Sequence, residues 1–189
     1  MYKDNSWPIP EGRFGLNVWR LNRILSLIYS RTNTIESTER EVPMLWSMMH
    51  MFSTCQLSKL VALQRGLDPE FAALTCAFHD IYTFIQGKTK DHGIKAEKYI
   101  REIITEYNTQ KKEKLPEISE EDITHIIKII QAHSDKNSIS EDPYIELLKD
   151  VDSLDSYLHG STLGRKSGRI PRVINLLVEF HINHTISRY

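Results

Sequence analysis

The sequence has few cysteines and no recognisable export signal. Two cysteines, Cys55 and Cys76, occur in 189 residues, which excludes the disulfide framework of a small secreted domain. The first ten residues, MYKDNSWPIP, lack the basic segment followed by an apolar segment that marks a secretory leader. We therefore expect a reducing, cytoplasmic location.

An excess of charge of one sign and long apolar runs are missing as well. The chain has 24 basic and 25 acidic residues, so no global field attracts nucleic acid or anionic lipid. No apolar run approaches the roughly 20 residues that a membrane-spanning helix needs. The sequence thus gives no strong nucleic-acid signal and predicts no membrane partner, whereas a homo-oligomer is compatible with it.

Several motifs that mark large enzyme classes are absent. The chain has no internal repeat, no glycine-rich phosphate loop, no CxxC pair and no Ser/His/Asp order that would suggest acyl transfer. Strand signals are absent too, while apolar residues recur at helical spacing in most segments. These patterns predict an all-α protein.

With 40% hydrophobic residues, the chain can bury a sizeable core and form one domain. We expect a single-domain helical bundle of about six to eight helices, with an exposed turn over residues 81–90. Residues 1–42 are predicted to be an N-terminal arm and helix packed on the core, and residues 43–189 the main helical domain. The predicted helices cover residues 16–29, 43–64, 69–80, 92–107, 120–134, 142–159 and 171–186.

The stretch FAALTCAFHD, residues 71–80, ends an apolar run with a histidine and a carboxylate. Eight of its ten residues are apolar or small, so a helix built from them is covered by protein nearly all round. A buried carboxylate without a cation costs several kcal/mol, and no Lys or Arg lies within five residues of His79-Asp80. A metal ion would compensate the charge. The alternative is a hydrogen-bonded His/Asp pair in the core.

Four further residues are candidate ligands. Each of the three histidines has a structural alternative. His50 lies among partly apolar neighbours in the second predicted helix and could be a core residue, and His92 could be exposed in the first turn of its helix. His133 lies within about 40° of the apolar stripe of its helix, so it should face inward, and its structural alternative is a core histidine. Asp152 interrupts an inward-looking apolar face, whereas Asp150 points about 160° away from it.

In chain order, the series His50, His79-Asp80, His92, His133, Asp152 resembles the HD-domain superfamily of metal-dependent phosphohydrolases. Its pattern runs H, HD, further H residues, then D. The resemblance spans residues 44–159 and includes the segments LTCAFHDI, DHGIKAEKYI, AHSDK and LLKDVDSLDSYLHG. Where many members have DADRLD, this chain has DVDSLD at residues 150–155. The missing arginine leaves the subfamily and the substrate open.

The resemblance implies that His50, His79, Asp80 and Asp152 hold one divalent ion. His92 and His133 could complete a second ion bridged by Asp80, or bind phosphate and transfer protons. The mixture of imidazole and carboxylate ligands suits Mn²⁺, Fe, Co²⁺, Ni²⁺ or Zn²⁺ better than Mg²⁺. We expect one or two ions per chain.

Three lysines are candidate phosphate contacts, but for each of them the favoured interpretation is a solvated surface residue: Lys88, Lys136 and Lys149. Lys136 is favoured among them because it follows His133 by three residues. The expected catalytic residues are therefore Asp80, His92, His133 and Lys136.

The leading hypothesis is a metal-dependent phosphohydrolase that acts on a small phosphorylated substrate, with a nucleotide favoured. Two alternatives stay open. The ligand order also resembles the mixed-valent di-iron oxygenases of the same superfamily. The other alternative is a nucleotide-binding or sensing module in which the metal is structural.

Overall fold

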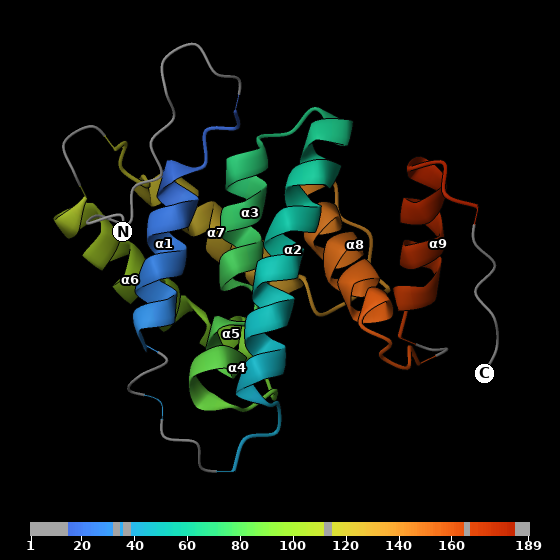
Figure 1. The fold of residues 1–189 in the computed structure, drawn as a ribbon, viewed down its shortest axis with the longest axis horizontal. Helices are drawn as coiled ribbons and strands as arrows, with labels where there is room; N and C mark the ends of the chain where they lie inside the picture. The colour runs from blue at the N-terminus through green and yellow to red at the C-terminus, as the bar shows by residue number, and fades with distance from the viewer. Residues whose placement is uncertain (1–14, 32–34, 36–38, 112–114, 165–166, 184–189) are drawn as a thin grey trace, which may run out of the picture.

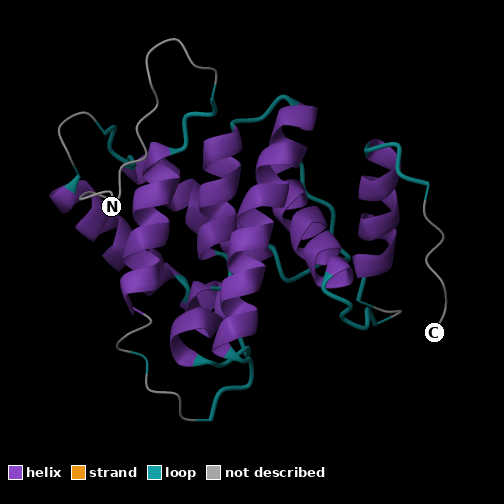
Figure 2. Ribbon diagram, viewed as in Figure 1, coloured by secondary structure: helices purple, strands orange, loops and turns teal. Residues whose placement is uncertain are grey.

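The computed structural model describes residues 15–31, 35, 39–111, 115–164 and 167–183. Over these ranges the chain has helices and no strand (Figures 1 and 2), so the predicted all-α class is confirmed. Seven helices have ten residues or more, and two are shorter. The helices are α1 (Trp19–Ser30), α2 (Met44–Arg65), α3 (Pro69–Phe78), α4 (Ile81–Gln86), α5 (His92–Lys95), α6 (Glu97–Gln110), α7 (Glu120–Ala132), α8 (Pro143–Leu158) and α9 (Arg169–Glu179).

Helix α3 lies at the centre of the bundle. It contacts α1, α2, α7 and α8, and Figure 1 shows it between α1 and α2. The Asp68 carboxylate caps it by accepting from the backbone N–H groups of Glu70 and Phe71, and Pro69 takes the first helical position, where its missing N–H does no harm. Every residue from Glu70 to Phe78 is buried. The end of this helix is therefore fixed deep in the protein.

A buried carboxylate joins α1 to α3. Glu70 accepts from the Arg20 backbone N–H at 2.8 Å and from Arg20 Nε at 2.7 Å. The first turn of α1 has N–H groups without helical partners, so this carboxylate caps α1 from the neighbouring helix. The helix in residues 1–42 packs on the core in this way. The domain boundary at residue 42 stays a prediction.

Three segments differ from the sequence-based expectation. The turn expected over residues 81–90 begins with helix α4, which ends where Gly87 adopts a positive φ of 68°. The helix expected over 92–107 is split at Ala96 into α5 and α6. Helix α9 ends at Glu179, because His181 has φ 57° and the Ile182 N–H turns back to the Leu177 carbonyl. The rest of the predicted C-terminal helix, from 184, lies outside the described residues.

Gly93 permits a close approach between α5 and α7. A Cβ placed on Gly93 would lie 2.7 Å from the Ile130 carbonyl oxygen and 3.6 Å from His133 Cε1. Glycine therefore lets His92, the preceding residue, come close to His133. No helix in the described ranges is long and apolar enough to cross a bilayer.

Candidate metal centre

The HD pair lies at the carboxyl end of α3, where the chain turns into α4. His79 is 1% exposed and follows the last residue of α3. Asp80 precedes α4, and its side chain is 27% exposed. Because both residues lie beyond the regular helix, Asp80 Oδ2 comes within 3.7 Å of His79 Nε2.

Helices α2 and α8 bring two more of the predicted ligands to this point. His50 from α2 places Nε2 3.1 Å from His79 Nε2 and 3.4 Å from Oδ1 of Asp152, which belongs to α8. His50, His79 and Asp152 are all buried and form one group of atoms that could hold a metal ion. Asp150, two residues earlier, instead binds Arg65 and Arg172.

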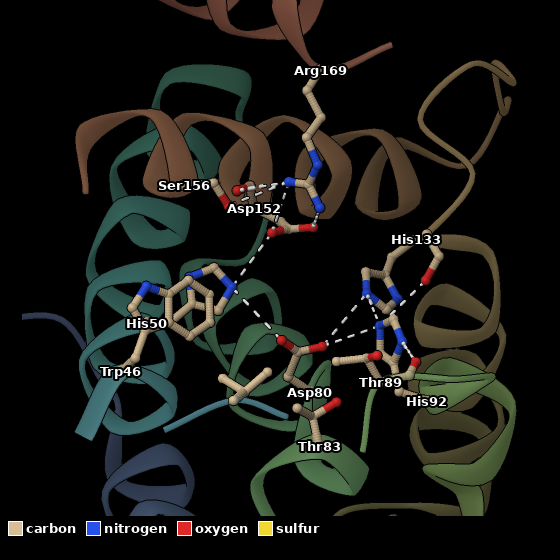
Figure 3. Close-up of a pocket in the computed structure, with 12 residues that line it drawn as sticks. Trp46, His50, Asp80, Thr83, Thr89, His92, His133, Asp152, Ser156 and Arg169 are labelled. Carbon is tan, nitrogen blue, oxygen red and sulfur yellow. Dashed lines mark hydrogen bonds and ion pairs between the residues drawn. The ribbon is translucent and has the colours of Figure 1, made fainter. Parts of the chain in front are cut away.

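A second group lies on the other side of Asp80. His92 Nε2 is 3.2 Å from Asp80 Oδ1 and 3.1 Å from His133 Nε2, and the three residues form a second group that could hold an ion. Oδ2 of Asp80 faces His50, whereas Oδ1 faces His92 and His133 (Figure 3). The carboxylate thus presents one oxygen to each group.

In all four histidines, Nδ1 contacts an oxygen acceptor that orients the ring. In three of them Nδ1 donates to a backbone carbonyl three residues earlier: His79 to Cys76, His92 to Thr89 and His133 to Ile130. A carbonyl can only accept, so Nδ1 carries the proton and Nε2 presents a lone pair in each neutral ring. His50 Nδ1 instead contacts Asp155 Oδ2 at 2.5 Å.

The Nε2 atoms consequently converge on two points. Burial lowers the pKa of His79 and lowers that of His133 strongly, so these rings are neutral at pH 7. Each of these lone pairs lies 3.1 Å from a second imidazole nitrogen, that of His79 from His50 Nε2 and that of His133 from His92 Nε2. A proton or a metal ion is therefore needed between the two nitrogens of each pair. Nitrogen and carboxylate donors in this arrangement fit a divalent transition metal.

The remaining charges show how the centre is balanced without metal. Burial opposes a charge on His50, but hydrogen bonds to Asp152 and Asp155 outweigh it and raise its pKa to about 9. Burial likewise opposes ionisation of Asp152, yet Lys136, His50 and Arg169 hold its pKa well below the usual range. A proton on His50 therefore stands where a metal ion would bind, and metal binding would release it.

A cavity of about 360 Å³ opens in front of the two groups. Several of the predicted ligands line it, and hydroxyl groups from Thr83, Thr89, Ser134 and Ser156 line it as well. Figure 3 shows Arg169 entering from the side opposite Asp80 and Thr83. The cavity is at the small end of the range for ligand sites.

The three candidate lysines lie in different places, none in the cavity wall. Lys136 is 4% exposed, and its Nζ donates to the His133 carbonyl and to Asp152 Oδ2. Lys149 is also buried and donates to Ser138 and Glu146. The favoured surface position was therefore wrong for both Lys136 and Lys149. Lys88 is exposed and donates to the Glu39 carbonyl.

Three residues at the centre were not singled out as site residues from the sequence. Arg169 contacts Asp152, Asp155 orients His50, and the Trp46 ring stacks on His50 with centroids 4.5 Å apart. Helical spacing does place Asp155 beside Asp152 on the inward face of α8, but it assigns Asp155 no role. Arg169 had no such signal, since only the packing of α9 on α8 brings it to the site.

Asp155 supplies a test of how the centre is positioned. We expect Asp155→Ala to weaken metal binding about 10- to 100-fold, because His50 loses the acceptor that fixes its ring. The measurement is metal affinity by calorimetry, with folding checked by circular dichroism. His159→Ala is the comparison variant, because His159 Nδ1 contacts the same Asp155 oxygen at 3.1 Å and its loss leaves the acceptor of His50 in place. Equal affinity in Asp155→Ala and wild type would show that His50 is held by packing alone.

Comparisons with known proteins agree with this geometry. Residues 48–158 match the family model of the HD domain. A solved structure described as a predicted HD superfamily hydrolase from an uncultured Thermotogales bacterium is similar, with 17% identity and a TM-score of 0.51, covering 86% of this chain and 89% of that one. At this identity the likeness shows the fold. No curated protein matches the chain significantly.

The fold and the converging ligands define a helical domain with a candidate metal centre. The family match covers more than half of the sequence. The chain belongs to the HD-domain family.

Proposed function

We propose that the protein is a metal-dependent phosphohydrolase that acts on a small phosphate ester, with a nucleotide as the favoured substrate class. The observation that carries the proposal is the cavity, because both candidate ligand groups and a guanidinium face it. Phosphate transfer needs cationic groups around the phosphorus oxygens. Trp46 in the same wall offers an aromatic surface to the rest of the substrate.

The charge of the centre supports an anionic substrate. The centre contains three carboxylates, Asp80, Asp152 and Asp155, and two cations, Lys136 and Arg169, both of which pair with Asp152. One divalent ion would leave the centre with a net positive charge, and a second ion would increase it. A positive cavity attracts and holds a phosphate group.

The residues of this chain have separable roles in the proposed reaction. His50, His79, Asp80 and Asp152 would hold a first ion, and Asp80, His92 and His133 a second one. A bound ion supplies Lewis acidity and lowers the pKa of a water molecule from about 15.7 toward 7. Asp155 and the backbone carbonyls keep the imidazole rings aimed at the centre. Lys136 holds Asp152 from behind.

A single-ion centre would use His92 and His133 differently. His92 Nε2 is within 3.3 Å of Ser134 Oγ, and its side chain is 21% exposed at the cavity. In that case His92 Nε2 would accept a proton, and the protonated ring would then donate to a phosphate oxygen or to the leaving group. We also propose a cytoplasmic location. A homo-oligomer is compatible with the fold.

The proposal is tested with protein purified without chelator. After metal analysis, Mn²⁺, Co²⁺, Ni²⁺ or Mg²⁺ is added to a panel of nucleotides and sugar phosphates. We expect release of phosphate or pyrophosphate from at least one compound, and none after metal removal. Oxygen consumption with iron bound and no hydrolysis would favour a di-iron oxygenase. Nucleotide binding without turnover would favour a sensing module.

A further inference from the structure

Arg169 is held at the cavity by the way α9 begins. Gly168 precedes it with φ 70°, and a Cβ there would lie 2.6 Å from Asn137 Oδ1 and 2.8 Å from the Lys136 carbonyl oxygen. The chain is therefore pressed directly against residues 136–137 at this point, which only glycine allows. The next residue, Arg169, extends over α8 into the cavity (Figure 3).

The guanidinium has one carboxylate partner among the described residues. Nη1 lies 3.1 Å from Asp152 Oδ1, and Nη2 lies 3.2 Å from Asp152 Oδ2. Nη1 also contacts the Asp152 carbonyl and, at 3.4 Å, Ser156 Oγ. Arg172, three residues later, is instead engaged by Glu146 and Asp150 on the outer side of α8. Both terminal nitrogens of Arg169 thus bind a candidate metal ligand.

The two Asp152 oxygens could not keep all of these contacts at full strength if Asp152 also bound a metal ion. Its Oδ2 accepts from Lys136, which is buried behind it, and its Oδ1 is 3.4 Å from His50 Nε2 at the metal position. The Arg169 side chain is 27% exposed on the open side. A cation held by Asp152 would compete for the same carboxylate oxygens and repel the guanidinium, which would leave the donors of Arg169 available to the cavity.

We propose that Arg169 is the substrate-binding residue that hydrogen-bonds the phosphate group, and that its contacts with Asp152 position the guanidinium in the absence of metal and substrate. The inference rests on the proposed function and names the anion that the site selects. A planar guanidinium binds two phosphate oxygens at once, which a lysine cannot do. Ser156 Oγ, beside Nη1, would add a further hydroxyl to the same phosphate.

The test measures binding separately from turnover. Inorganic phosphate is titrated by calorimetry into Mn²⁺-loaded wild type, Arg169→Gln and Arg169→Lys, and metal content is determined for each. We expect Arg169→Gln to raise the phosphate Kd and the substrate KM by about ten- to a hundredfold with metal content unchanged. Arg169→Lys should restore only part of the affinity. Lys98→Gln, which removes a positive charge from an exposed site on α6, should behave as wild type.

The other outcomes separate this inference from the proposed function. If wild type hydrolyses phosphate esters and Arg169→Gln keeps its phosphate Kd and KM, the inference is wrong and the function stands. If Arg169→Gln loses metal, Arg169 supports Asp152 and does not bind substrate. If wild type neither binds phosphate nor hydrolyses an ester, both proposals are wrong.

Discussion

Asp80→Ala should lower kcat/KM by more than about a hundredfold, beyond what the loss of an outer partner of a metal ligand costs. Asp80 is the residue whose two oxygens face both candidate ion positions, Oδ2 toward His50 and Oδ1 toward His92. Its loss therefore affects the centre whether one ion or two are bound. The measurement is steady-state kinetics with the best substrate of the panel, together with metal analysis.

Thermal unfolding gives the same variant a second readout. Metal at about a hundred times its Kd should raise the Tm of wild type by about 5–10 °C, and Asp80→Ala should lose this increase. Its helical circular dichroism should persist, because the Asp80 side chain is partly exposed and follows the end of α3. Glu102→Ala removes an exposed carboxylate from α6 and serves as the control. Activity above about one per cent of wild type would assign Asp80 a structural role.

The helices were predictable because their signals are local. The Asp68-Pro69 start, the apolar run of α3 and the capping signal at Ser119, whose hydroxyl accepts from the Asp122 backbone N–H, each act within a few residues. Helix α4 was missed because its six residues precede Gly87 and two lysines, which are typical of a turn. Such a short helix is stabilised by packing, since Ile81 and Phe84 are buried.

The candidate site was predictable where residues share a helix face or a known pattern. His133 and Asp152 lie on the inward faces of their helices, as the helical wheel predicted. The pairing of Lys136 with Asp152 and of Arg169 with the same carboxylate depends on how α8, α9 and the end of α7 meet. Contacts between distant segments leave no periodic signal in one sequence. For this reason the cations around Asp152 became visible only in the fold.

His92→Ala should reduce the bound metal from about two ions per chain to about one and lower kcat/KM by about a hundredfold. His92 and His133 place their Nε2 atoms 3.1 Å apart, and Asp80 completes that group with an oxygen of its own. Three donors separate from His50, His79 and Asp152 are enough for a second ion. The measurement is metal stoichiometry by elemental analysis after saturation with Mn²⁺ or Fe.

Matched variants make this result specific. His133→Ala should have the same effect on stoichiometry, although His133 is 2% exposed and its loss also costs stability. His50→Ala and Asp152→Ala should disturb the other ion. His125→Ala is the control on α7, the helix that His133 directly follows, because His125 is about one-third exposed and binds Asp142 outside the cavity. If wild type saturates at one ion and His92→Ala keeps it while turnover falls, His92 acts on the substrate or on a proton. If metal content and rate both stay at the wild-type level, the second group is a structural histidine pair, and the centre consists of His50, His79, Asp80 and Asp152.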